Sequence, residues 1–158
     1  MLELTSVLTT TDIVIRILIA IGFGTIIGLE RTLAGKIAGM RTYAMVALGS
    51  SLFILISEII LSTVSNPSLA NPLLIASAII TGIGFIGAGL VILQNDKIIG
   101  LTTAAGLWVS AGVGIASGFG LFTLAIIATI ASLFIFTLEK ILENSVKKYS
   151  YKTGDGQK

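Results

Sequence analysis

The chain has 158 residues, of which 54% are hydrophobic and 11% are charged, with a net charge of +2 and a mean hydropathy of +1.03. A soluble domain has about 25% charged residues, so these values exclude a chain whose whole surface faces water. Cysteine and histidine are absent, which excludes disulfides, thiolate chemistry and nucleophile–histidine triads. We therefore expect one membrane-embedded domain that is not an enzyme, has no cofactor or metal site and binds no nucleic acid.

Five apolar runs are long enough to cross a lipid bilayer, since a membrane-spanning helix needs about 20 residues. They comprise residues 13–29, 44–64, 73–93, 98–116 and 119–138. Backbone N–H and C=O groups must be paired within each segment in lipid, so each run is predicted to be a helix. The prediction is an all-α integral membrane protein with five transmembrane helices and glycine-rich helix packing. Residues 1–138 would form the transmembrane domain, and residues 139–158 a short basic cytoplasmic tail.

The ends of the runs carry further signals. Residues 1–12 contain no Lys or Arg, so no cleavable signal peptide is expected and the first run should remain as a span. Asn71 is expected to cap the third helix, with Pro72 at its first position. The last two runs are separated only by residues 117–120, which favours a tight helical hairpin; a re-entrant segment is the alternative.

A polar loop separates the first two runs. It contains the charged residues Glu30, Arg31, Lys36 and Arg41. Of the ten Lys and Arg residues, all except Arg16 lie in this loop, in the loop between the third and fourth runs, or in the C-terminal tail. Positively charged loops stay in the cytoplasm, so the N-terminus is predicted to be outside and the C-terminus inside. A Glu30–Arg41 bridge would join the two ends of the loop; the alternative is that the cations only set the topology.

Arg16 and Glu58 are ionisable residues within the apolar runs, where each charge costs a few kcal/mol at mid-depth. Arg16 is 13 residues before the end of the first run, and Glu58 is 14 residues after the start of the second. At about 1.5 Å per residue, both lie about 20 Å from the cytoplasmic face. The two interpretations are an ion pair that locks the first two helices together and an ion or proton pathway.

The 18 glycines of the chain are concentrated in the apolar runs and beside them. Small residues let helix backbones approach closely in lipid, and on this basis helix packing is predicted at Gly24, Gly28, Gly82, Gly84, Gly87 and Gly89. The alternative for the third run is local unwinding, in which exposed carbonyl groups coordinate ions. This run also matches GxGxxG, but a dinucleotide-binding fingerprint requires a preceding strand in a soluble βαβ unit, so that interpretation is rejected.

Four segments carry a resemblance to a known family. They are Ile27-Gly-Leu-Glu-Arg31, Ala38-Gly-Met-Arg-Thr42, Gly82-Ile-Gly-Phe-Ile-Gly-Ala-Gly89 and Gly100-Leu-Thr-Thr-Ala-Ala-Gly-Leu-Trp108. In their order and spacing they resemble the MgtC/SapB membrane family over residues 15–138. The resemblance implies a multi-pass protein of the bacterial plasma (inner) membrane, linked to magnesium homeostasis, virulence and survival inside host phagocytes. Many members carry a soluble C-terminal domain, for which residues 139–158 are too few.

The resemblance also implies a non-enzymatic protein that regulates other membrane proteins such as the rotary ATP synthase. The alternative is an ion transporter or channel, with magnesium as one ion it could carry and Glu30, Glu58 and Asp96 as its carboxylate ligands. A symmetric homodimer in the lipid bilayer is predicted, since glycine-faced helices leave small-residue surface to bury. The candidate functional residues are Arg16, Glu30, Arg31, Arg41, Thr42, Glu58, Asp96, Thr102, Thr103 and Trp108.

Overall fold

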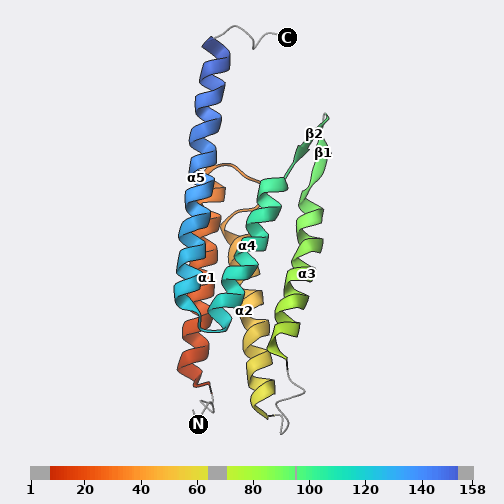
Figure 1. Ribbon diagram of the computed structural model, residues 1–158, viewed down its shortest axis with the longest axis vertical. Coiled ribbons are helices and arrows are strands. Elements are labelled where there is room, and N and C mark those ends of the chain that lie inside the picture. Colours follow the sequence, from red (N-terminus) through yellow and green to blue (C-terminus); the bar gives the residue numbers. More distant parts are fainter. Residues whose placement is uncertain (1–7, 64–70, 95, 153–158) are drawn as a thin grey trace.

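Five long helices lie roughly along the long axis of the molecule in the computed structural model, which describes residues 8–63, 71–94 and 96–152 (Figure 1). The helices are α1 (Thr10–Leu33), α2 (Met40–Thr63), α3 (Pro72–Leu90), α4 (Leu101–Gly118) and α5 (Phe122–Lys152). Two short strands form an antiparallel hairpin between α3 and α4. They are β1 (Ile92–Gln94) and β2 (Lys97–Ile99).

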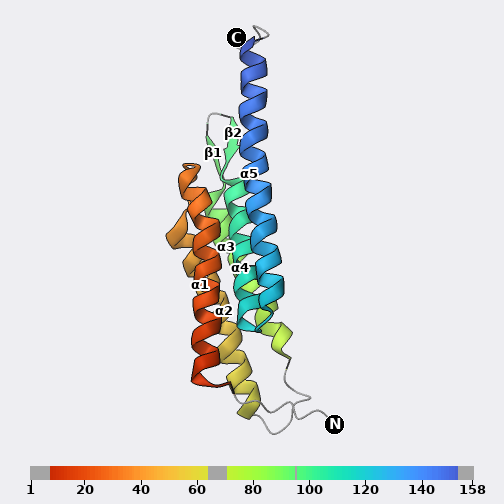
Figure 2. The ribbon, with the colours of Figure 1, turned by 90° about the vertical axis from the view of Figure 1, so that its left-hand side faces the viewer.

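All five helices in the described residues are long and apolar enough to cross a membrane, which confirms this part of the prediction. Each spans at least 18 residues, or about 27 Å, close to the thickness of the hydrocarbon core. Helix α5 continues past its membrane-length segment and projects beyond the bundle (Figure 2). The α1–α2 connection, the β-hairpin and the C-terminal part of α5 lie toward one end of the molecule (Figure 1). Which end faces the cytoplasm stays a prediction.

The predicted boundaries are wrong between the third and fourth runs, where a β-hairpin replaces the ends of two helices. Helix α3 ends at Leu90 rather than at residue 93, and α4 begins at Leu101 rather than at residue 98. The cross-strand pairs are Ile92 with Ile99, Leu93 with Ile98 and Gln94 with Lys97. Hydropathy does not distinguish a short apolar strand from the end of an apolar helix, so the apolar strand residues are included in the predicted helices.

Two residues with positive φ shape this hairpin. Asp96 has a φ of 58°, a left-handed conformation that Asp adopts more readily than most residues. Gly100 has a φ of 88° and immediately precedes α4. A Cβ at residue 100 would overlap the carbonyl oxygen of Leu90. The close passage of β2 into α4 therefore depends on glycine at this position.

Other helix ends agree with the sequence signals. The Asn71 side chain accepts a hydrogen bond from the backbone N–H of Leu73 at 3.0 Å, and Pro72 occupies the first turn of α3, as predicted. Helix α4 ends at Gly118 and α5 begins at Phe122. The two helices lie side by side as a helical hairpin (Figure 1, Figure 2).

The closest helix packing is that of α2 against α1 and α4. A Cβ on Gly24 would lie 2.7 Å from the carbonyl oxygen of Tyr43, and one on Gly28 would lie 2.6 Å from the Cα of Met40. Gly118 of α4 is equally close to α2. Helix α4 is the most enclosed span, with 56% of its residues buried, against 17% to 33% for the other four. Small residues at these positions allow the backbone approach that dispersion forces require in lipid.

The glycines of α3 are placed differently. Within the described chain, no atom lies within 4 Å of the position that a Cβ would take at Gly82, Gly84 or Gly89. Gly87 makes an ordinary contact with Ala104, at 3.5 Å. Gly82, Gly84 and Gly89 therefore do not support packing inside this chain, and they leave small-residue surface on α3 uncovered.

Candidate functional site

Two charged clusters and one hydrogen-bonded contact contain half of the predicted functional residues. The first cluster, the Arg16 junction, consists of Arg16, Glu58 and Gly118. The Nη1 atom of Arg16 donates to Glu58 Oε2 at 2.6 Å and to the carbonyl oxygen of Gly118 at 2.7 Å. Gly118 is the last residue of α4, where backbone carbonyl groups lack helical partners and carry partial negative charge. One guanidinium therefore joins α1 to both α2 and the C-terminal end of α4.

The structure brings Arg16 and Glu58 together, as the ion-pair interpretation expects. Their side chains are 18% and 29% exposed, and Arg16 Nη1 lies 2.6 Å from Glu58 Oε2. Asp12, one turn before Arg16, accepts hydrogen bonds from the backbone N–H and hydroxyl of Thr9 at 3.1 and 2.6 Å. The sequence did not point to the Gly118 carbonyl, because a backbone acceptor leaves no side-chain signal.

The second cluster, the Arg31 cluster, lies where the C-terminal end of α1 meets α5. It consists of Glu30, Arg31, Lys36, Phe136 and Glu139. Arg31 Nε lies 2.5 Å from Glu30 Oε2, and Arg31 Nη1 lies 3.8 Å from Glu139 Oε2. The guanidinium is stacked on the ring of Phe136 at 3.6 Å from the centroid, and Lys36 Nζ lies 3.9 Å from Glu139 Oε1. The cluster therefore links α1 and its following loop to α5.

Arg31 is buried to an unusual degree for a charged residue, with 1% of its side chain exposed. Its Nη1 atom has no hydrogen-bond acceptor among the described residues. Stacking on an aromatic face is worth about 0.5–2 kcal/mol and is favoured for Arg, because its planar guanidinium is weakly hydrated. The Phe136 ring and the Glu30 carboxylate together compensate the burial of this cation.

A hydrogen-bonded contact connects two of the family-like segments. Tyr43, directly after Thr42, is fully buried, and its hydroxyl donates to the backbone carbonyl oxygen of Thr103 at 3.3 Å. In return, the Ser110 hydroxyl donates to the backbone carbonyl oxygen of Tyr43 at 2.9 Å. A Cβ on Gly106 would overlap the Tyr43 hydroxyl. The start of α2 and the first half of α4 are thus fitted to each other.

The sequence interpretation missed Tyr43, Ser110 and Phe136. Gly106 was an available signal, since a glycine within a helix often marks a bulky neighbour. The proposed Glu30–Arg41 bridge is wrong: Glu30 pairs with Arg31, and no ion pair of Arg41 occurs within the described residues.

Several candidates are not brought to either cluster. Arg41, Thr42, Asp96, Thr102 and Trp108 are all exposed in the described chain. Thr103 is buried, but it contributes its backbone carbonyl.

The three carboxylates considered as cation ligands are also separate. Glu30 pairs with Arg31, Glu58 with Arg16, and Asp96 lies at the turn of the β-hairpin. Among the described residues, no group of three or more acidic side chains could hold a metal ion together.

The chain is similar to several known proteins. It is 38% identical over 128 residues to YhiD of Escherichia coli (strain K12), named as a candidate magnesium transporter, which covers 80% of this chain and 60% of that protein. It is 43% identical over 117 residues to Protein MgtC of Salmonella typhimurium (strain LT2), covering 74% of this chain and 48% of that protein. An uncharacterised protein of Haemophilus influenzae is 36% identical over 141 residues, covering 87% of this chain and 59% of that protein.

The chain thus spans about half to three fifths of the length of these relatives. No solved structure matches it significantly. Residues 17–145 match the MgtC family. This range includes α2, α3 and α4 completely, most of α1, and the membrane-length segment of α5. The family match over most of the sequence, together with relatives at about 40% identity, shows that this chain belongs to the MgtC family.

Proposed function

We propose that this chain is a non-enzymatic bacterial membrane protein that regulates other membrane proteins through helix–helix contacts. The setting is adaptation to low magnesium and survival inside host phagocytes, and the rotary ATP synthase is one candidate partner. The observation that carries the proposal is the uncovered small-residue surface of α3, where Gly84 and Gly89 have no neighbouring atom within 4 Å of a Cβ position. Small residues at a lipid-facing surface allow another helix to approach closely.

The engagement of the intramembrane charges also supports regulation rather than transport. Glu58 is held by Arg16 at 2.6 Å, and the same guanidinium binds the end of α4. A magnesium ion retains several waters and binds carboxylates that are free to approach it. Glu58 therefore has a structural role, because it pairs with a cation at a junction of three helices. This pairing offsets the free-energy cost of placing its charge in the membrane without a bound ion.

The test is capture of partners by crosslinking and pull-down from bacteria grown under magnesium limitation. Gly84→Leu should reduce capture of membrane-protein partners, because the added side chain occupies the approach surface of α3. The matched control is Gly22→Leu on α1, a position that is equally free of neighbours, and it should capture partners as the unmodified protein does. The absence of any specific partner, or equal capture by both variants, would count against the proposal.

An ion transporter or channel is the second candidate, because Arg16 and Glu58 lie within membrane-length helices and the YhiD name refers to magnesium transport. Purified protein in proteoliposomes would be assayed for magnesium flux, with Glu58→Gln as the comparison. We expect no flux above that of empty vesicles. A flux that is lost in Glu58→Gln would instead establish the transport function.

We infer that the N-terminus is outside and the C-terminus inside, as positively charged loops prefer the cytoplasm. The chain contains no cysteine, so single cysteines introduced at Lys97 and Ser68 can report the two sides. Lys97→Cys should react with an impermeant maleimide only after the cells are opened, and Ser68→Cys should react in intact cells. The reverse labelling would overturn the orientation. A homodimer, also proposed, would be detected as twice the chain mass by light scattering in detergent.

A further inference from the structure

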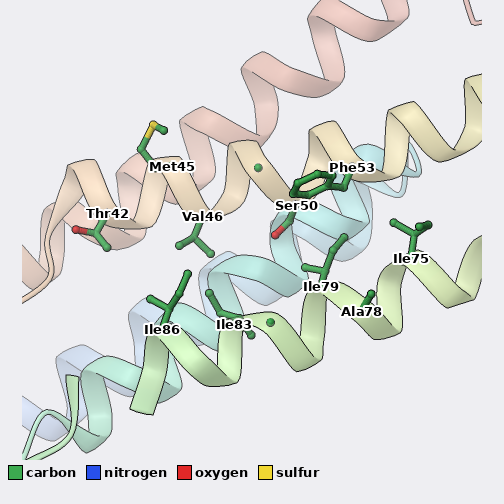
Figure 3. A pocket seen from close by; sticks show the side chains of 12 residues that line it. Thr42, Met45, Val46, Ser50, Phe53, Ile75, Ala78, Ile79, Ile83 and Ile86 are labelled. Atoms are coloured by element: carbon green, nitrogen blue, oxygen red, sulfur yellow. The ribbon is translucent and has the colours of Figure 1, made fainter. Parts of the chain in front are cut away.

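An apolar groove lies between α2 and α3 and has a volume of about 640 Å³ (Figure 3). The groove forms because each wall has a glycine, which has no side chain to fill the space. Gly49 of α2 and Gly82 of α3 line the groove, and neither has an atom within 4 Å of a Cβ position in the described chain. Helix α3 packs mainly against α4, so its contact with α2 stays open along one side.

The chemistry of the walls limits the occupant to an apolar molecule. Apart from the hydroxyls of Thr42 and Ser50, the side chains that line the groove are hydrocarbon, aromatic or thioether groups (Figure 3). On α2 the lining extends from Thr42 to Phe53, and on α3 from Ile75 to Ile86. All of these residues are in membrane-length helices. The occupant therefore enters from the bilayer.

The dimensions of the groove suit an extended hydrocarbon chain. The lining residues 42–53 of α2 cover about 17 Å at about 1.5 Å per residue, so a groove of about 640 Å³ is long and narrow. An α-helix with its side chains is about 10 Å across, so the groove would enclose only one face of it. An extended hydrocarbon chain is much narrower and fits.

The charge at one end of the groove indicates which lipid is bound. Arg41 precedes Thr42 at the start of α2, and it lies one helical turn before Met45, which also lines the groove. Arg41 is exposed, and no carboxylate of the described residues pairs with it. A cation beside an apolar cleft between transmembrane helices suits an anionic headgroup.

We propose that this groove binds an anionic phospholipid, with one acyl chain along α2 and α3 and the phosphate next to Arg41. This site is independent of the proposed regulatory function, which rests on the uncovered glycines of α3 that lie outside the groove. It gives Arg41 a specific ligand where the expected bridge to Glu30 is not formed.

The experiment uses the full chain in nanodiscs made of equal parts phosphatidylcholine and phosphatidylglycerol. The protein is released with a mild detergent, and native mass spectrometry measures the retained lipid. We expect retention of phosphatidylglycerol by the unmodified protein and about tenfold less by Gly82→Leu, because the added side chain overfills the groove. Gly84→Leu is the matched control, since residue 84 has the same open surroundings but does not line the groove. It should retain lipid normally.

Arg41→Gln tests the headgroup separately from the acyl chain. It should still retain lipid, but its preference for phosphatidylglycerol over phosphatidylcholine should fall about fivefold, the factor expected for one cation near a lipid surface. Circular dichroism would establish that each variant is folded, and Gly49→Leu on the opposite wall replaces Gly82→Leu if that variant does not fold.

Two results would overturn the proposal. One is equal lipid retention by Gly82→Leu and Gly84→Leu. The other is a loss of homo-oligomer mass in Gly82→Leu with lipid retention unchanged, which would show that a second copy of the chain occupies the groove.

Discussion

The Arg16 junction can be tested with a double-mutant cycle that replaces each charged side chain by an apolar one. The variants are Arg16→Met, Glu58→Leu and the two together. If the pair exists as the structure shows, each single change leaves one charge without its partner inside the bundle. The double change removes both charges, so it should be less harmful than the sum of its parts.

The expected magnitudes follow from the geometry. Breaking a buried pair costs about 3–5 kcal/mol, and breaking an exposed pair costs about 1 kcal/mol or less. The two side chains are 18% and 29% exposed, so we expect about 2 kcal/mol for each single variant. The double variant loses the hydrogen bond to the Gly118 carbonyl oxygen, worth about 1 kcal/mol. The coupling energy should therefore be about 3 kcal/mol.

Reversible unfolding in mixed micelles, with increasing sodium dodecyl sulfate and far-ultraviolet circular dichroism, would measure these free energies. Ile60→Leu is the control, because Ile60 is exposed on the same helix as Glu58. It should change the free energy of unfolding by less than about 0.5 kcal/mol. Additive effects of the two single changes would refute the pair. A Glu58→Leu variant as stable as the unmodified protein would also refute it.

Three further predictions concern packing, stacking and backbone conformation. Gly28→Ala should lower the free energy of unfolding by about 2 kcal/mol, because its Cβ would lie 2.6 Å from the backbone of α2; Gly22→Ala, with no atom within 4 Å, should raise it by about 0.5–1 kcal/mol. The two midpoints in the micelle assay would be compared, and the same sign for both would contradict the packing argument. Arg31→Lys should cost about 1–2 kcal/mol, since an ammonium cannot stack as a guanidinium does; an unchanged midpoint would be evidence against the Arg31 cluster. Gly100→Ala should be more harmful than Gly35→Ala, although both residues have positive φ, 88° and 66°. A Cβ at residue 100 would also overlap Leu90 at the end of α3, whereas a Cβ at residue 35 has only the conformational penalty of about 1 kcal/mol. Equal losses of unfolding free energy in the same assay would contradict this.

Part of the candidate site could be predicted because its residues are unusual for their surroundings. Arg16 and Glu58 stand out as charges within apolar runs, and counting residues along two antiparallel helices places them at one depth. The Arg31 cluster could not be predicted in the same way. Arg31 lies in a polar loop-like stretch, and its partners Phe136 and Glu139 are more than 100 residues away on α5. Nothing in the local pattern indicates which face of α5 meets α1.

The β-hairpin shows a second limit. Ile92, Leu93 and Ile98 are as apolar as the helices next to them, and their pairing across the hairpin depends on contacts between strands rather than on local composition.

The sequence by itself determined the class of the protein, the number of its spans and the placement of cations at one end, because lipid imposes its constraint on each segment separately. A helix in hydrocarbon must be long and apolar whatever its neighbours are. Only the tertiary structure decided which glycines are covered. Gly24 and Gly28 are in close contact with α2, whereas Gly82 and Gly84 have no atom of the described residues within 4 Å of a Cβ position, although all four satisfy the same small-residue pattern. The difference depends on the rotation and spacing of the helices, and these follow from side-chain contacts between segments distant in the chain.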